Sequence, residues 1–183
     1  PNTWDKFFEV WVLAKLLKAL EEKGKELFGT VELNMSSLEH RGVGPIATIE
    51  ANKLRLEIYY QNSTLLKSRW KYNGGDRLHG IPDIIISVKR HPNFLIMIDV
   101  KNILFEGRRD GNAEKYKMLG YFESFRDSLK HQPIGILILR NDKNYYSDYL
   151  YTEENAKLSL FTVSPSYSIE AFPSIAIYIW ELT

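Results

Sequence analysis

Residues 81–101 read IPDIIISVKRHPNFLIMIDVK, which is two apolar runs separated by a short polar connection. Each run has the length of a β-strand and is rich in isoleucine and valine, the residues that strands favour. Neither run alternates cleanly with polar residues, which is typical of strands buried on both faces of a sheet. The stretch therefore predicts a hairpin of two buried strands, around which the rest of the chain can be arranged.

Three charged side chains lie inside the two predicted strands. Asp83 opens the first strand, whereas Asp99 and Lys101 end the second. An antiparallel hairpin places the start of its first strand beside the end of its second, and side chains two positions apart on a strand share a face. We therefore expect two carboxylates and an ammonium group to converge at one open end of the sheet.

This convergence has a chemical consequence. Two carboxylates at one point repel each other, and a buried charge is costly unless it is paired or bound to a metal. A hard divalent cation removes the conflict, and Mg²⁺, for which Mn²⁺ can substitute, is often held by one or two carboxylates and a substrate phosphate. The metal would acidify a water that the neighbouring lysine positions. The alternative is that these charges only mark the solvent-exposed end of the hairpin.

The pair Pro82-Asp83, followed after a gap by Asp99-Val100-Lys101, resembles the signature of the PD-(D/E)xK nuclease superfamily, which includes many restriction endonucleases. The resemblance implies an α/β fold (an α+β mixed sheet) with a restriction-endonuclease-like core, in which helices flank a central mixed β-sheet.

The composition is that of an ordinary globular protein, with 44% hydrophobic and 26% charged residues. The length suits a single domain over residues 1–183. The absence of cysteine excludes disulfides and thiolate metal sites and fits a cytoplasmic location. No apolar run approaches transmembrane length, so we expect no membrane association. The chain opens at Pro1 without a methionine, as a fragment of a longer protein would.

The net charge of +1 does not indicate a nucleic-acid-binding protein, but the local charge of one window does. Residues 67–90 hold six basic and two acidic residues, a local charge of +4, together with Trp70 and Tyr72. A basic and aromatic approach to the predicted site suits a phosphate backbone, although an ordinary solvated loop has the same composition. The candidate nucleic-acid-binding residues here and in the later loop are Arg69, Lys71, Arg77, Arg108 and Arg109.

Residues 3–23 predict a first helix that Thr3 caps and Gly24 ends, with leucines at helical spacing on one face. Glu9 lies on that apolar stripe, and a carboxylate on a buried face needs a partner. One interpretation is a further ligand for the metal or for a metal-bound water. The other is a partly exposed first-turn glutamate that pairs with a lysine.

Residues 113–130 predict a second helix, capped by Asn112, on which Lys117 and Tyr121 lie one turn apart. Apolar runs before and after this helix predict two parallel strands joined by a right-handed crossover. The predicted strands are 45–50, 53–61, 94–101, 134–140, 158–163 and 175–180, and the predicted loops are 61–80 and a tyrosine-rich segment at 141–155.

Three further stretches narrow the resemblance: Phe7-Phe8-Glu9-Val10-Trp11, Tyr59-Tyr60-Gln61-Asn62 and Lys117-Met118-Leu119-Gly120-Tyr121. Together they resemble nuclease domains of McrC-like subunits of McrBC-type restriction systems. Some of these relatives carry an arginine before the Pro-Asp pair, where this chain has Ile81. The resemblance implies a larger parent protein with this domain at its C-terminus, and DNA, a nucleotide-driven McrB-like AAA+ GTPase or ATPase and a second copy of the chain as partners.

The first functional hypothesis is a metal-dependent DNA endonuclease domain. The second is a nucleic-acid-binding module that keeps the fold without catalysis, and the third is a nuclease of repair or junction resolution. The residues assigned by the first hypothesis are Asp83, Asp99, Glu9 and the Val100 carbonyl as metal ligands, Lys101 as the group that orients water, and Lys117 and Tyr121 as support for the phosphate or the catalytic set.

Overall fold

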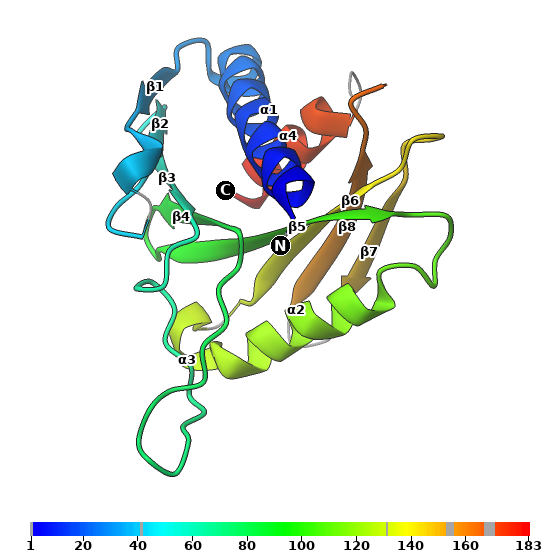
Figure 1. Cartoon of the computed structure of the whole chain (residues 1–183). Helices are drawn as coiled ribbons and strands as arrows, with labels where there is room; N and C mark the ends of the chain where they lie inside the picture. Colours follow the sequence, from blue (N-terminus) through cyan, green and yellow to red (C-terminus); the bar gives the residue numbers. More distant parts are fainter. Residues whose placement is uncertain (1, 41, 131, 153–155, 167–170) are drawn as a thin grey trace.

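The computed structural model describes residues 2–40, 42–130, 132–152, 156–166 and 171–183. Within these residues the chain forms one eight-stranded mixed sheet and four α-helices (Figure 1). The strands are β1 Glu32–Met35, β2 Ala47–Ala51, β3 Leu54–Tyr60, β4 Ile84–Lys89, β5 Phe94–Leu104, β6 Ile134–Arg140, β7 Ser147–Tyr151 and β8 Lys157–Val163. The helices are α1 Thr3–Phe28, α2 Asn112–Ser124, α3 Arg126–Leu129 and α4 Ala171–Leu182, and a 3₁₀ turn lies at Leu38–His40.

The predicted hairpin is confirmed and lies in the interior of the sheet. The strand order is β1-β2-β3-β4-β5-β6-β8-β7, so β4 and β5 each have a neighbour on both sides. They pair antiparallel with Ile84 opposite Ile98, and most of their residues are buried. β5 pairs parallel with β6, as the predicted crossover through the second helix requires. The fold class is therefore mixed α/β.

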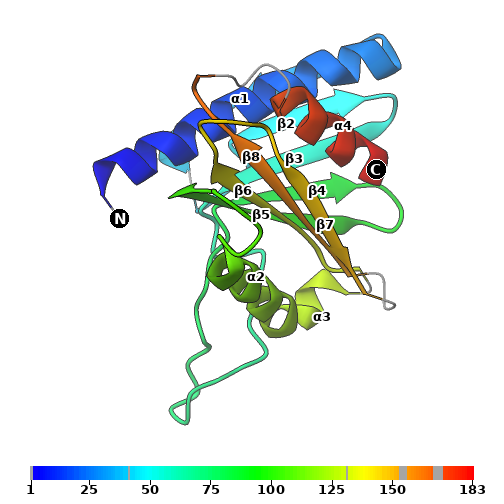
Figure 2. The same ribbon diagram turned by 90° about the vertical axis from the view of Figure 1, so that its right-hand side faces the viewer.

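Helices cover both faces of the sheet. Figure 2 shows α1 and α4 on one face and α2 with α3 on the other. Alternate residues of the hairpin face the two layers, because successive side chains of a strand point in opposite directions. Ile84, Ile86 and Ile98 pack in the core under α1 and α4, whereas Ile85 and Met97 pack in the core under α2 and α3.

The first helix is longer than predicted. It continues past Gly24 to Phe28 and ends at Gly29, whose φ of 84° suits a glycine. Gly24 does not end the helix because it serves packing: a Cβ there would lie 2.8 Å from Val31 Cγ2 and 3.0 Å from Trp180 Cζ2. The prediction that Thr3 caps the helix is also wrong, since Asn2 Oδ1 accepts the Asp5 amide at 2.9 Å.

Three predicted elements near the C-terminal half differ from the structure. The predicted strand 175–180 is part of α4, and the predicted loop 141–155 contains β7. The predicted helix 113–130 is two helices that meet at Phe125, and its N-cap is Gly111 with φ 75° rather than Asn112. The structure does not describe 153–155, so the end of that predicted loop lies outside it. In the described part of the chain, no helix combines the length and the apolar character needed to cross a membrane.

Candidate active site

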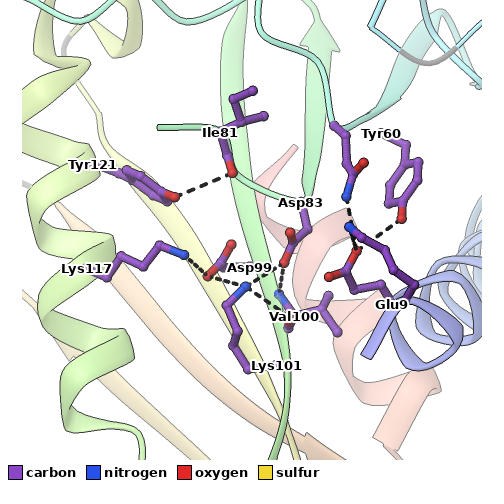
Figure 3. Close-up of polar contacts among 11 residues, drawn as sticks. Glu9, Tyr60, Ile81, Asp83, Asp99, Val100, Lys101, Lys117 and Tyr121 are labelled. Carbon is purple, nitrogen blue, oxygen red and sulfur yellow. Dashed lines mark hydrogen bonds and ion pairs between the residues drawn. The ribbon is translucent and has the colours of Figure 1, made fainter. Parts of the chain in front are cut away.

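Asp83 and the end of β5 meet on the face of the sheet that α2 covers. Asp83 Oδ2 accepts hydrogen bonds from the Val100 amide at 2.7 Å and from Lys101 Nζ at 3.1 Å (Figure 3). The backbone carbonyl of Asp83 accepts the Gln61 amide at 2.8 Å, which ties the residue to the end of β3 as well. The expected convergence of the two hairpin ends is therefore confirmed.

Asp99 is fully buried, with none of its surface exposed. Its Oδ2 atom lies 3.1 Å from Lys101 Nζ and 3.3 Å from Lys117 Nζ. Its Oδ1 atom is also buried and has no hydrogen-bond partner among the residues that the structure describes. A buried carboxylate oxygen without a partner is costly, so this atom calls for a bound ion or water.

Lys101 lies between the two carboxylates. Besides its contacts to Asp83 and Asp99, its Nζ donates to the Val100 carbonyl at 3.2 Å. Burial by itself lowers the pKa of this ammonium, but the charges of Asp99 and Asp83 more than offset that effect, so the pKa lies above its ordinary value. Lys101 is therefore a protonated cation throughout the physiological pH range.

Helix α2 adds two side chains from the same face of the sheet. Lys117 Nζ reaches Asp99, and it also lies 5.4 Å from the centre of the Tyr121 ring, one helical turn further on. The Tyr121 hydroxyl donates to the Ile81 carbonyl at 3.4 Å, next to Pro82 and Asp83. Helix α2 thus contacts Asp99 through Lys117, and it contacts the segment before Asp83 through Tyr121.

Glu9 approaches the same end of the hairpin from α1, on the opposite face of the sheet (Figure 3). It is buried, and its Oε2 atom accepts from Lys6 Nζ at 3.0 Å, from the Tyr60 hydroxyl at 3.1 Å and from Gln61 Nε2 at 3.2 Å. The lysine pairing that the sequence suggested is present, but the side chain is buried rather than partly exposed. In the described ranges, no three Asp, Glu, His or Cys side chains form a group that could hold a metal. A role of Glu9 in metal binding stays a prediction.

Sequence reasoning did not assign Tyr60 and Gln61 to the site, although they bind Glu9. Their position in the sequence could have indicated this role. Tyr60 and Gln61 end a predicted strand, and in a meander that strand lies next to the strand that begins at Pro82-Asp83. Tyr60 pairs opposite Ile84, so its place at this end of the sheet follows from the register. The two residues link Glu9 to the strand that flanks Asp83.

Three of the basic residues before β4, Arg69, Lys71 and Arg77, belong to a projecting loop, the finger, at residues 68–80 (Figure 1). Its stem is fixed to the α2–α3 junction, because the Ser68 and Ser124 hydroxyls lie 2.6 Å apart and the Arg69 amide donates to the Ser124 carbonyl at 2.8 Å. Near its tip Lys71 and Arg77 form a β-bridge. Trp70 and Tyr72 are 55% and 62% exposed, which leaves their rings free to stack on a ligand.

The five candidate nucleic-acid-binding residues do not form one patch. Arg69 pairs with Glu123 at 3.4 Å, and Arg77 donates to the Ser68 carbonyl, so both partly serve to hold the finger. Arg108 and Arg109 lie in the loop before α2, where Arg108 pairs with Asp148 at 3.5 Å. The finger and this loop lie at opposite ends of α2 (Figure 1).

The electrostatics of the site predict a pH dependence of stability. Burial, followed by the charge of Asp99, raises the pKa of Asp83 from its ordinary 3.8 to about 7. Between these two values the folded protein keeps a proton that the unfolded chain has lost. Stability therefore falls as the pH rises from about 4 to about 7, by roughly 4 kcal/mol at most for a shift of this size.

The measurement is chemical unfolding in EDTA across this pH range, with Asp83→Asn as the matched variant. The amide cannot ionise, so the difference in unfolding free energy between the unaltered chain and the variant should shift against the unaltered chain as the pH rises. Parallel pH profiles for the two proteins would show that Asp83 ionises normally and that the carboxylates are not in conflict.

No known protein-family model matches this chain, and a search of curated proteins finds no match either. The assignment of function therefore depends on the residues and the geometry of the site.

The residues present fit a divalent cation. The fit rests on the orphaned Oδ1 of Asp99 and on an all-oxygen donor set, the two carboxylates and the Val100 carbonyl, that already surrounds a cationic group. Two carboxylates are enough for Mg²⁺, which usually keeps several waters and takes further ligands from a substrate phosphate.

Proposed function

We propose that this chain is a metal-dependent DNA endonuclease domain of the PD-(D/E)xK type, which hydrolyses phosphodiester bonds. The observation that carries the proposal is the arrangement at the hairpin end. Three oxygens, from Asp83, Asp99 and Val100, surround one positive charge, and Lys117 supplies a second cation beside Asp99. A metal-assisted hydrolase needs buried carboxylates beside cationic side chains. A hairpin with a purely structural role does not need them.

The fold supports the same proposal. A meander of β3, β4 and β5 followed by a parallel crossover through α2 to β6 is the layout expected of a restriction-endonuclease-like core. The site lies where β5 runs parallel to β6, with α1 on one face and α2 on the other. Each helix supplies a polar side chain to that end of the hairpin, Glu9 from α1 and Lys117 from α2.

The mechanism divides the work among these residues. A bound Mg²⁺ supplies charge neutralisation on the phosphate and acidification of a water. Asp83, Asp99 and the Val100 carbonyl would hold it. Lys101 would orient the attacking water and donate to the negative charge that develops on the phosphate. Lys117 would hold Asp99 in place, while Tyr121 fixes the Ile81 backbone so that Asp83 keeps its position.

The biological setting is part of the proposal. The narrower likeness to McrC-like subunits favours a restriction system, in which this domain would act in the cytoplasm on DNA, as a pair of copies and driven by an McrB-like AAA+ GTPase or ATPase. A repair or junction-resolving nuclease would use the same site.

A non-catalytic binding module is favoured by one observation, the exposed finger with Trp70, Tyr72 and Lys71. A nuclease could use the same finger to bind DNA. The two proposed functions are therefore distinguished by whether the DNA is cleaved. The test is incubation of supercoiled plasmid with the purified protein in Mg²⁺ or Mn²⁺, with and without a candidate motor subunit. Nicking or linearisation that EDTA abolishes is expected, whereas DNA binding without cleavage in every arm would favour the binding module.

The finger predicts a salt dependence of DNA binding. Lys71 suits this test best, because its side chain is exposed and, among the residues that the structure describes, its contact is a backbone bridge to Arg77. Lys71→Gln should weaken binding to all sequences alike and flatten the plot of log affinity against log salt by about one unit of slope. Lys15→Gln is the matched control, since Lys15 is an exposed lysine on α1, on the other face of the sheet. Equal slopes of log affinity against log salt for the two variants would show that the finger does not contact DNA.

A further inference from the structure

Lys101 makes contacts that conflict with the catalytic task assigned to it. An ammonium group has three N–H donors and no acceptor. The Lys101 ammonium is surrounded by three oxygens: Asp83 Oδ2 at 3.1 Å, Asp99 Oδ2 at 3.1 Å and the Val100 carbonyl at 3.2 Å. The number of contacts equals the number of donors. The contacts with Asp83 and Val100 are hydrogen bonds and the contact with Asp99 is an ion pair, so the ammonium is directed at these three oxygens rather than at a water or a phosphate.

Asp83, Asp99 and the Val100 carbonyl are also the groups that the proposed function assigns to the metal. A divalent cation binds carboxylate and carbonyl oxygens at about 2.0–2.6 Å, inside the distance at which the ammonium now sits. Both cations would draw on the same two carboxylates and the same carbonyl, and in a site of low polarity they would repel each other strongly. The two cannot share the position.

We propose that Lys101 occupies the position of the metal in the metal-free protein, and that a divalent cation loads the site by displacing this ammonium. This proposal rests on the proposed function, because the metal ligands are those assigned there. It adds that metal binding controls the position of Lys101. The bound cation frees the three N–H donors, so the lysine becomes available for water and phosphate only once the metal is in place. Loading and activation of the lysine are then one event.

The surroundings allow such a movement. The Lys101 side chain is 23% exposed, so it has a route toward solvent, whereas Asp99 is fully enclosed and stays where it is. Lys117 remains beside Asp99 at 3.3 Å and has no contact with Asp83 or the Val100 carbonyl, so a metal on those oxygens would leave its ion pair intact. The displaced ammonium would move along the face of the sheet that α2 covers, where the substrate phosphate would bind.

A matched pair of lysine variants tests the proposal. Lys101→Met and Lys117→Met each remove one positive charge within 3.3 Å of Asp99 Oδ2, but only Lys101 also contacts Asp83 and Val100. The probe is Mn²⁺ alone, titrated into each protein by calorimetry at pH about 8, so that protons on the carboxylates compete less with the cation. Lys101→Met should bind Mn²⁺ about tenfold or more tightly than Lys117→Met, since it also removes the competing contacts with Asp83 and the Val100 carbonyl.

The outcomes separate this proposal from the proposed function. Equal tightening in both lysine variants would show a general electrostatic effect and would overturn the displacement, while the metal site stands. An absence of Mn²⁺ binding to the unaltered protein and to both folded lysine variants would overturn the displacement and the metal site together.

A second measurement needs no variant and covers the case in which Lys101→Met does not fold. In crystals of the unaltered protein soaked with Mn²⁺, Lys101 Nζ should lie beyond hydrogen-bonding distance, more than about 3.5 Å, from Asp83 Oδ2 and the Val100 carbonyl. An ammonium that keeps both contacts next to a bound Mn²⁺ would overturn the displacement and leave the metal site intact.

Discussion

Asp99→Asn is expected to abolish DNA cleavage, lowering the rate by roughly a thousandfold or more. The reason is that a metal contributes several kcal/mol of charge stabilisation to phosphate hydrolysis, and each 1.36 kcal/mol corresponds to about a factor of ten in rate. Asp99 is the fully buried member of the carboxylate pair, and its free Oδ1 is the oxygen best placed to gain a ligand. The rate is measured on supercoiled plasmid at saturating Mg²⁺.

The control for this change is a buried polar residue on the same face of the hairpin. Ser87 lies in β4, four residues after Asp83, and is 3% exposed. Ser87→Ala should leave cleavage within a few-fold of the unaltered protein. Thermal unfolding of both variants shows whether the fold survives. Because Lys101 and Lys117 lose a partner in Asp99→Asn, that variant should lose about 1–3 kcal/mol of stability and still fold. Cleavage that persists in a folded Asp99→Asn protein would exclude this carboxylate from catalysis.

Lys101→Ala has the second-largest expected effect. The cleavage rate should fall by a hundredfold or more, as for loss of a donor that acts in the transition state, while the affinity for DNA changes little. Both Lys101→Ala and Lys71→Gln remove one positive charge, so a general electrostatic effect would make them alike. The account predicts opposite patterns: lost turnover in the first and weakened, less salt-dependent binding in the second.

The comparison is made at saturating DNA, where binding and turnover separate. If Lys101→Ala weakened binding as much as the finger variant did and kept full turnover, the lysine would anchor DNA rather than act on the reaction. That result would favour the non-catalytic binding module.

The hairpin and its charges could be predicted from the sequence because they follow from local rules. A strand has a period of two, so the identity of the buried runs fixed which side chains share a face and which ends meet. Asp83, Asp99 and Lys101 converge as that geometry requires. The contact of Lys117 with Asp99 was not predictable in the same way, because it depends on the position of α2 over the sheet.

The errors have physical causes that sequence patterns do not resolve. Residues 175–180 are a short apolar run rich in isoleucine, as a buried strand would be, yet the buried set of α4 has helical spacing: Ala171, Phe172, Ile175, Ala176, Ile179 and Trp180. Packing against α1 decides in favour of the helix, through Trp180 Nε1, which donates to the Leu20 carbonyl at 3.0 Å, and the Trp11–Phe172 ring contact. The prediction that Gly24 ends the first helix is wrong for the same reason: the absence of a side chain there leaves room for the Trp180 ring.

The residue pattern predicts repulsion between the two carboxylates and a divalent cation that removes it. The structure places Lys101 between them and Lys117 beside Asp99, so two ammonium groups offset part of that repulsion. Which lysine pairs with which carboxylate depends on side-chain rotamers and burial, which cannot be read from the order of residues along the chain.

The most direct test of the central claim is the position of Mn²⁺, located by its anomalous scattering in crystals of this chain. The account predicts one strong peak within about 2.0–2.6 Å of carboxylate oxygens of both Asp83 and Asp99 and of the Val100 carbonyl. A site without such a peak at saturating Mn²⁺, or a peak that contacts only one of the two carboxylates, would contradict it.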